Sequence, residues 1–159
     1  MSEQALTGVR ILDFSQVLAG PFATQLMAQL GAQVIKVEQP VGGDMTRGLM
    51  STSSDGMAPS FLAANLGKRS LTLDLKNPKA KEIVHKLVAE ADVIVENFKP
   101  GTIERLGFGF EAMKAIKPDL VYASISGFGQ TGPRANLPAF DGAIQAYSGM
   151  MSISGHAQT

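Results

Sequence analysis

Hydrophobic positions along the chain fall alternately into short apolar runs and longer stretches with helical spacing. Residues 9–14 form the first run, the pattern of a strand covered on both faces. A helix is predicted to follow, with Pro21 in its first turn and Gly31 as its left-handed stop. Its apolar side chains recur at i, i+3, i+4 and i+7, and they are Ala23, Leu26, Met27 and Leu30.

The same alternation continues to the end of the chain. Further strands are predicted at residues 33–38, 70–75, 92–95 and 120–125. Asn77 and Pro78 are suited to cap and open a helix whose apolar face holds Ala80, Ile83, Val84, Leu87 and Val88. Other helices are predicted at 100–106, 110–116 and 140–151.

Residues 39–59 lack any period and are rich in Gly, Ser, Thr and Asp, so they are predicted to form a long surface loop of functional type. Strands that alternate with helices favour one fold class: α/β, with a Rossmann-like doubly wound parallel sheet. At 159 residues the chain fits a single domain spanning 1–159.

Composition removes several classes of function. Hydrophobic residues make up 45% and charged residues 18%, as in ordinary globular domains. Fourteen basic residues balance fourteen acidic ones, which argues against a nucleic-acid or membrane-surface partner. Cysteine is absent, and the two histidines, His85 and His156, are too few for a histidine-built metal centre. The polar N-terminus reads as neither signal peptide nor membrane anchor, so a cytoplasmic location is expected.

A glycine pattern at Gly127-Phe128-Gly129-Gln130-Thr131-Gly132 formally matches the dinucleotide fingerprint. That fingerprint requires the third glycine to open a helix directly after the first strand. Here Pro133 and Arg134 follow, and the preceding strand is the fifth. The pattern therefore does not predict NAD binding.

Polar residues that follow predicted strands are the stronger signal, because ligands of doubly wound sheets bind where the strands end. Basic side chains there could neutralise a phosphorylated ligand such as coenzyme A. The same spacing is explained equally well if Lys76, Lys99 and Arg105 are surface charges that face water and bind no ligand. The residues concerned are Ser15, Gln16, Gln39, Lys76, Asn97, Phe98, Lys99 and Arg105.

Asp141 is the carboxylate that the sequence singles out, since it stands at the start of the last predicted helix. A helix N-cap explains it without catalysis. Contact with a substrate is the alternative.

Several ordered segments resemble family III CoA-transferases, the CaiB/BaiF or formyl-CoA transferase-like group. The resemblance spans nearly the whole chain, and it is to the N-terminal part of the family's sequence. The matching segments are residues 12–21, 31–38, 43–47, 65–70, 92–101 and 127–133.

The resemblance implies a homodimer of interlocked chains whose large, Rossmann-like domain binds CoA and is completed by a C-terminal part. On that basis residues 1–159 form an incomplete domain. Coenzyme A or acyl-CoA is implied as a substrate together with a carboxylic acid, with no tightly bound cofactor. The CoA contacts carried over by similarity are Leu18, Ala19, Gln39, Leu73, Asp74, Leu75, Lys76, Asn97, Phe98, Lys99, Arg105, Pro138, Ala139, Phe140 and Asp141.

Family chemistry relies on an aspartate that attacks the acyl-CoA thioester and later carries CoA as an aspartyl thioester. The resemblance implies that this nucleophile lies after Thr159, with Gln16 and Asp141 in supporting roles. Acyl-CoA racemases of the same superfamily are an alternative, but they carry histidine where this chain has Phe140. A non-catalytic CoA-binding fragment is the third hypothesis.

Overall fold

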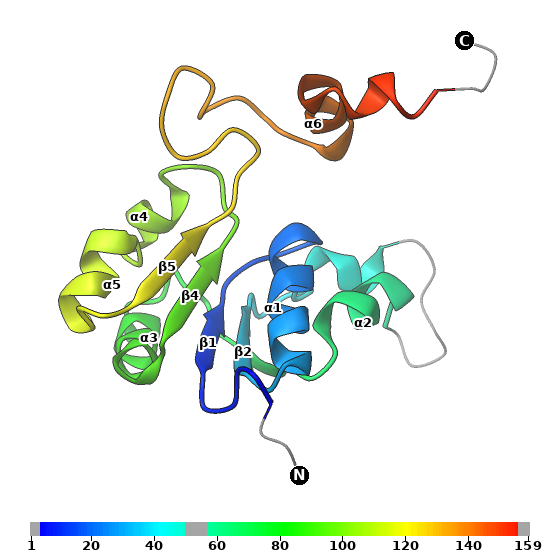
Figure 1. Ribbon diagram of the computed structural model, residues 1–159. Coiled ribbons are helices and arrows are strands. Elements are labelled where there is room, and N and C mark those ends of the chain that lie inside the picture. The colour runs from blue at the N-terminus through cyan, green and yellow to red at the C-terminus, as the bar shows by residue number, and fades with distance from the viewer. Residues whose placement is uncertain (1–3, 50–56, 156–159) are drawn as a thin grey trace. The chain divides into compact units, whose positions relative to one another are not determined.

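A five-stranded parallel sheet forms the centre of the computed structural model, which describes residues 4–49 and 57–155 (Figure 1). The strand order is β3-β2-β1-β4-β5, and every neighbouring pair is parallel. This order confirms the predicted doubly wound fold, because the chain starts in the middle of the sheet and builds outward twice. The strands are β1 (Arg10–Asp13), β2 (Gln33–Glu38), β3 (Arg69–Thr72), β4 (Val93–Glu96) and β5 (Val121–Ser124).

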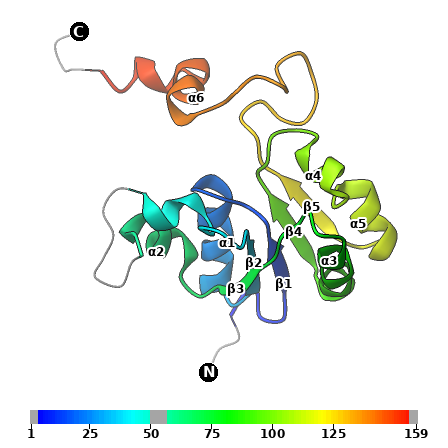
Figure 2. The same ribbon diagram turned by 180° about the vertical axis from the view of Figure 1, so that it is seen from behind.

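Helices cover both faces of this sheet (Figures 1 and 2). One face carries α1 (Ala19–Gln29) and α2 (Pro59–Asn65), which pack against each other. The opposite face carries the other three, which are α3 (Pro78–Glu90), α4 (Thr102–Leu106) and α5 (Phe110–Ile116). The crossover from β3 to β4 is where the chain changes face.

Two hydrophobic clusters correspond to the two faces. The larger one lies under α3, α4 and α5, where Val84, Val88 and Met113 are fully buried against Leu12 and Ile94 of the sheet. The smaller one lies under α1, and its buried members are Ile11, Ala32, Val34 and Val95. Both faces of β1 are therefore covered, as its apolar run predicted.

Helix α3 follows the sequence prediction in its start and cap, although Ile83 of the predicted apolar face is 42% exposed. The Asn77 side chain accepts a hydrogen bond from the Lys79 amide at 3.0 Å, and Pro78 occupies the first helical turn. Its buried residues are Ala80, Val84 and Val88.

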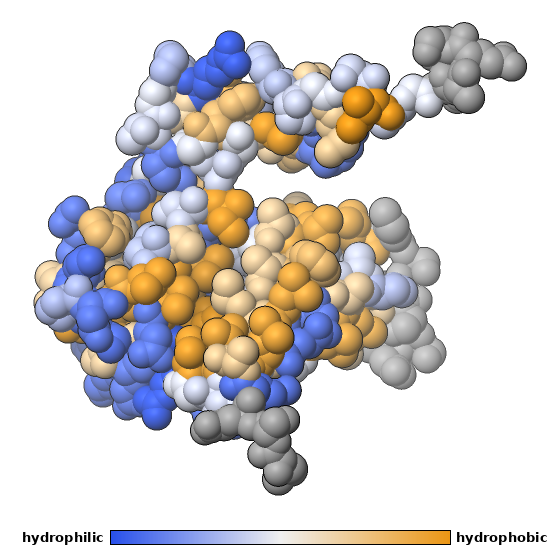
Figure 3. Space-filling view, viewed as in Figure 1, coloured by the Kyte–Doolittle hydropathy of each residue, from blue (hydrophilic) through white to orange (hydrophobic). Residues whose placement is uncertain are grey.

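Helix α1 departs from its prediction. Leu26 and Leu30 are exposed, and the buried face instead holds small or polar residues, among them Gly20 and Thr24. The reason is that this face of α1 packs over buried polar side chains at the carboxyl ends of the strands. Figure 3 shows apolar side chains over α1 and the neighbouring strands, and Val121 of β5 is 59% exposed. Within the first unit, part of this face is thus left uncovered.

The predicted loop at 39–59 is partly structured. Residues Met45–Gly48 form a 3-10 helix, η1, and α2 begins at Pro59, which periodicity did not predict. Helix α2 is only seven residues long, too short for a helical period to stand out. Residues 50–56 of this loop lie outside the described residues.

The chain divides into two compact units, residues 1–125 and 126–159. In the second unit, the predicted helix at 140–151 is split: α6 (Asp141–Ser148) ends at Gly149, whose φ is +81°, and a 3-10 helix, η2 (Met150–Ser152), follows. Phe128 and Tyr147 meet edge to face with ring centroids 5.1 Å apart. The single-domain organisation stays a prediction.

Among the described residues, we find no helix with both the length and the apolar character needed to span a bilayer.

The unequal burial of the two helical layers gives a stability test. Met113→Ala should lower the free energy of unfolding by about 2–5 kcal/mol, because it empties a fully buried site. Leu26→Ala, at a position 43% exposed, should cost less than about 1 kcal/mol. Urea titrations of both variants measure this. Equal losses would contradict the assignment of the core.

Candidate functional site

The carboxyl ends of β1 and β4 meet at the switch point of the sheet, where the chain winds outward in both directions. Ligands of open α/β sheets bind in the crevice at this point. Gln16 follows β1 and Asn97 follows β4, and the structure brings them together. The Gln16 amide donates to Asn97 Oδ1 at 2.8 Å, and Asn97 Nδ2 donates to the Gln16 carbonyl at 2.7 Å.

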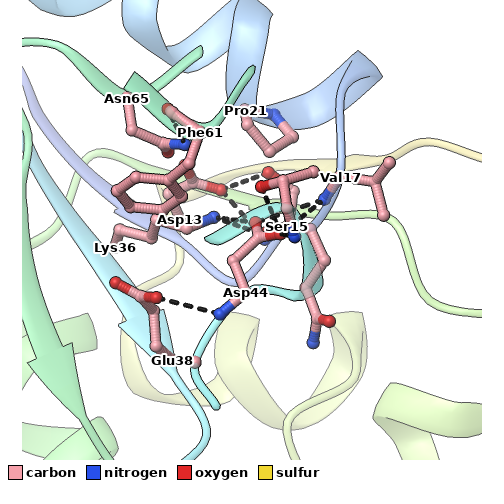
Figure 4. Close-up of polar contacts among 12 residues, drawn as sticks. Asp13, Ser15, Val17, Pro21, Lys36, Glu38, Asp44, Phe61 and Asn65 are labelled. Carbon is pink, nitrogen blue, oxygen red and sulfur yellow. Dashed lines mark hydrogen bonds and ion pairs between the residues drawn. The ribbon is translucent and has the colours of Figure 1, made fainter. Parts of the chain in front are cut away.

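Val17 adopts an unusual backbone conformation in the turn that follows. Its φ is +67°, a left-handed value that a β-branched residue seldom adopts. The Val17 amide points at the carboxylate of Asp44, with N to O distances of 3.3 and 3.2 Å. Asp44 comes from the 39–59 segment, so residues distant in sequence fix this turn (Figure 4).

Asp44 is fully enclosed and forms an ion pair with Lys36. The distance from Lys36 Nζ to Asp44 Oδ2 is 2.9 Å, and the two side chains are 2% and 0% exposed. Lys36 also donates to the Ser15 carbonyl at 2.7 Å. Burial acts to raise the pKa of Asp44, but hydrogen bonds from the Thr46 amide and from Lys36 outweigh it, so its pKa lies below the ordinary value. Asp44 is therefore charged at neutral pH.

A second buried ion pair joins Lys68 to Asp13, at 2.9 Å, with side chains 2% and 0% exposed. Lys68 also donates to the Pro21 carbonyl and to Asn65 Oδ1. Asp13 accepts a hydrogen bond from the Thr24 hydroxyl at 2.6 Å and further bonds from Ser15. Burial lowers the pKa of Lys68, and the charge of Asp13 opposes that effect.

A third pair joins Arg47 to Glu38 by two parallel bonds of 2.7 Å each. Glu38 also accepts from the Asp44 amide at 3.0 Å and from the Ser70 hydroxyl at 2.7 Å. The Arg47 guanidinium lies 3.8 Å from the centre of the Phe61 ring of α2. Burial would raise the pKa of Glu38, yet the bonds from Arg47, Asp44 and Ser70 together lower it to about 2.

Two glycines allow the segments that carry these charged residues to approach one another closely. A Cβ on Gly20 would collide with the Ser15 side chain, so only glycine lets the start of α1 rest on the end of β1. Gly43 has a φ of +61°, and a Cβ there would meet Glu38 Oε2 at 2.7 Å. Both glycines thus permit close packing around the three ion pairs Lys36–Asp44, Lys68–Asp13 and Arg47–Glu38, which together form an ionic layer.

The residues that the sequence proposed as CoA contacts fall into two groups. In the first unit they follow the ends of four neighbouring strands, as predicted. Leu18, Ala19, Gln39, Lys76, Lys99 and Arg105 are exposed there. Leu73, Leu75 and Phe98 are half-buried against the larger hydrophobic cluster, and Asp74 accepts from the Lys76 amide.

The Phe98 amide is held by the carboxylate of Glu96 at 2.8 Å. Glu96 is buried, and burial raises its pKa despite a hydrogen bond from Ser124. The Arg105 guanidinium donates to the Thr102 hydroxyl at 2.9 Å and otherwise reaches the surface.

Pro138, Ala139, Phe140 and Asp141 lie in the second unit. The N-cap prediction for Asp141 is wrong: Phe140 is the N-cap, and Asp141 is the first helical residue of α6. Its carboxylate instead accepts from Gln145 Nε2 one turn along the helix. The glycine pattern at 127–132 opens no helix, since α6 begins nine positions after Gly132.

Sequence reasoning missed the ionic layer. The sequence patterns predict no role for four of its residues, Lys36, Asp44, Glu38 and Lys68, although segments 31–38, 43–47 and 65–70 all carry the resemblance to the family. A charged residue inside an otherwise apolar strand, such as Lys36 in β2, was the available signal. Periodicity cannot supply its partner, which comes from a loop.

A further cavity lies away from these residues, within the first unit. It has a volume of about 450 Å³ and opens at the amino ends of the strands, among Arg10, Gln33 and Arg69. None of the predicted contact residues lines it. No group of three or more potential metal-binding side chains occurs among residues 4–49 and 57–155.

Comparisons with known proteins identify the relatives of this chain. The family model described as CoA-transferase family III matches residues 6–159. The succinate–glutarate CoA-transferase of Agrobacterium fabrum is 46% identical over 156 residues, covering 94% of this chain and 39% of that protein. The formyl-CoA:oxalate CoA-transferase of Bradyrhizobium diazoefficiens is 47% identical over 152 residues, covering 96% of this chain and 36% of that protein.

A solved structure supports the same family assignment. The crystal structure of a CaiB/BaiF family protein from Brucella suis superposes with a TM-score of 0.91 at 43% identity. The match covers 97% of this chain and 42% of that one. The chain thus spans about two fifths of the length of the relatives it matches.

The lowered pKa of Glu38 predicts a specific acid sensitivity. Its carboxylate stabilises the fold fully above its unfolded pKa of 4.5, and that stabilisation is lost as pH falls toward about 2. The loss should reach roughly 3 kcal/mol. Glu38→Gln should lower stability at pH 7 and flatten the dependence of unfolding free energy on pH below 4.5.

Glu90→Gln is the matched control, because its carboxylate pairs with Arg10 at the surface and is 74% exposed. Its pH profile should parallel that of the unaltered protein. Denaturant titrations between pH 2 and 7 measure both. A Glu38→Gln profile as steep as that of the control would refute the prediction.

Proposed function

Because this chain belongs to the family III CoA-transferases, we propose that it forms the CoA-binding part of an enzyme that moves CoA from an acyl-CoA to a carboxylic acid. The observation that carries the proposal is the meeting of Gln16 and Asn97 at the switch point of the sheet. Both residues belong to segments that resemble the family, and ligands of this type of fold bind at this point of the sheet.

The chemistry of CoA suits the side chains around this edge. CoA carries several phosphate groups, and the exposed cations Lys76, Lys99 and Arg105 follow strands β3 and β4. Arginine can bind phosphate oxygens through paired hydrogen bonds. Leu18, which is 62% exposed, offers an apolar surface for the less polar part of the ligand. Gln39 carries no charge and would contribute hydrogen bonds alone.

We assign the covalent step to an aspartate outside this chain. Its carboxylate attacks the acyl carbonyl, the CoA thiolate leaves, and a mixed anhydride forms. The thiolate then attacks the aspartyl carbonyl and expels the donor as a free carboxylate, which leaves an aspartyl-CoA thioester. The acceptor carboxylate reverses these two steps, taking CoA and regenerating the aspartate. Gln16 and Asp141 would support this chemistry without forming the bond.

Phe140 favours transfer over racemisation. A racemase needs a base beside the thioester to abstract a proton, and a phenyl ring cannot do so. Phe140 is 81% exposed in the second unit, immediately before Asp141.

The proposal extends to the complete protein. We expect a homodimer in the cytoplasm, in which further chain covers the apolar surface left open on α1 and on Val121. An uncovered apolar surface of this kind favours association with another segment or chain.

Coenzyme A should bind to the 159-residue chain weakly but measurably, whereas NAD should not bind. Arg105→Ala and Lys76→Ala should each weaken CoA binding by about threefold to tenfold, because each removes a cation from phosphate. These losses should shrink as ionic strength rises. Isothermal titration calorimetry at low and high salt measures them.

Lys86→Ala is the matched control, since Lys86 is an exposed lysine of α3 and is absent from the predicted contacts. Its affinity should be unchanged. NAD binding without a response to CoA would overturn the proposal. Equal effects from all three substitutions would instead mean that Lys76 and Arg105 are ordinary surface charges.

The 159-residue chain should show no CoA transfer between acyl-CoA and carboxylate, because covalent catalysis cannot be recovered by groups that only bind. A CoA-exchange assay with hydroxylamine trapping and mass spectrometry tests this. Trapping at Asp141 with sustained turnover would place the nucleophile inside this chain and defeat the assignment.

A further inference from the structure

The segment Gly43–Arg47 carries a buried carboxylate for which the proposed reaction provides no use. We propose that Asp44 is a positioning residue: it accepts the Val17 amide and thereby holds the turn after β1 in the shape that receives CoA. This inference rests on the proposed function for its consequence, but its structural part stands independently. Asp44 would act through the turn and would not touch the ligand.

The strained backbone of Val17 is the first observation. A left-handed conformation is unfavourable for a non-glycine residue, so it persists at Val17 only because its surroundings impose it. The Asp44 carboxylate faces the Val17 amide with both oxygens. Removing this acceptor leaves the turn free to relax toward an ordinary conformation.

The rigidity of Asp44 is the second observation. Lys36 holds one of its oxygens at 2.9 Å, and the Thr46 amide and hydroxyl hold the other at 2.9 and 2.7 Å. Its own amide donates to Glu38, which Arg47 fixes in turn. The carboxylate is therefore anchored to β2 and to η1, and it can impose a fixed position on whatever it binds.

The location of the turn is the third observation. Asn97 holds the amide and carbonyl of Gln16 from β4, while Asp44 holds the next amide from the opposite side. Leu18 and Ala19, both predicted CoA contacts, follow at once. Two elements on either side of the switch point thus determine where these residues lie.

Two double variants isolate the hydrogen bond from the charge. Lys36→Met with Asp44→Asn removes the buried ion pair but keeps an oxygen that can accept the Val17 amide. Lys36→Met with Asp44→Leu has a similar shape without any acceptor. Neutralising both partners avoids leaving one charge buried alone.

Amide hydrogen exchange, measured by NMR, gives the direct readout. The Val17 amide should exchange roughly tenfold faster or more in the Leu variant than in the Asn variant, because it lacks its acceptor. The Phe14 amide, which donates to the Val95 carbonyl at 2.8 Å inside the sheet, is the internal control for global stability. Equal Val17 exchange in the two variants, after this correction, would overturn the proposal.

CoA titration of the same variants tests the consequence. The Asn variant should retain the affinity of the unaltered chain, and the Leu variant should lose roughly tenfold or more. Equal affinities with unequal Val17 exchange would refute the positioning role. If the unaltered chain fails to bind CoA while Val17 exchange still separates the variants, the proposed function fails and the structural part of the inference stands.

Thr46→Val provides a second route if the Leu variant does not fold. It removes the hydroxyl that holds Asp44 and leaves both the ion pair and the Val17 contact in place. Val17 exchange should rise relative to Phe14 when compared with the unaltered chain, because the Asp44 carboxylate is held less firmly. An unchanged ratio would count against the proposal.

Discussion

Charge pairing beneath α1 and α2 is the constraint on which the candidate site depends. Three cations, Lys36, Lys68 and Arg47, meet three anions between the ends of the strands and the helices above them. A buried charge without its partner is strongly destabilising, whereas a paired and hydrogen-bonded one is tolerated. In each pair the two partners come from different segments, so the pairs can form only when those segments are assembled together.

This requirement explains why polar atoms occupy a place that a doubly wound sheet usually fills with apolar side chains. The helix face over the layer is small and polar, with Gly20 and Thr24 where leucines were expected. Such a layer contributes less hydrophobic stabilisation than an apolar one, but its hydrogen bonds hold the groups that they join in fixed orientations. Packing alone would leave the turn at Val17 free to adopt a commoner conformation.

The two faces of the sheet therefore contribute different properties to the protein. The face under α3, α4 and α5 supplies most of the apolar core, with Val84, Ile94 and Met113 inaccessible to solvent. The opposite face supplies the fixed geometry at the edge where ligands of this fold bind. Stability and site geometry are therefore carried by different layers, joined through β1, whose Leu12 and Asp13 point to opposite faces.

The sequence by itself determined the order and type of most elements, because apolar periodicity is a local property. It predicted the strands, the Asn77 cap of α3 and the positions after strand ends where Gln16 and Asn97 lie. Only the tertiary structure decided that Asp44 meets Lys36 and Val17, that Lys68 meets Asp13, and that Asp141 is not a cap. The contacts of Val17 with Asp44 and of Asp13 with Lys68 join residues far apart in the chain. The Lys36–Asp44 pair depends on how a loop folds back onto β2, and the helix start at Asp141 depends on backbone angles. None of these appears in a pattern of neighbouring residues.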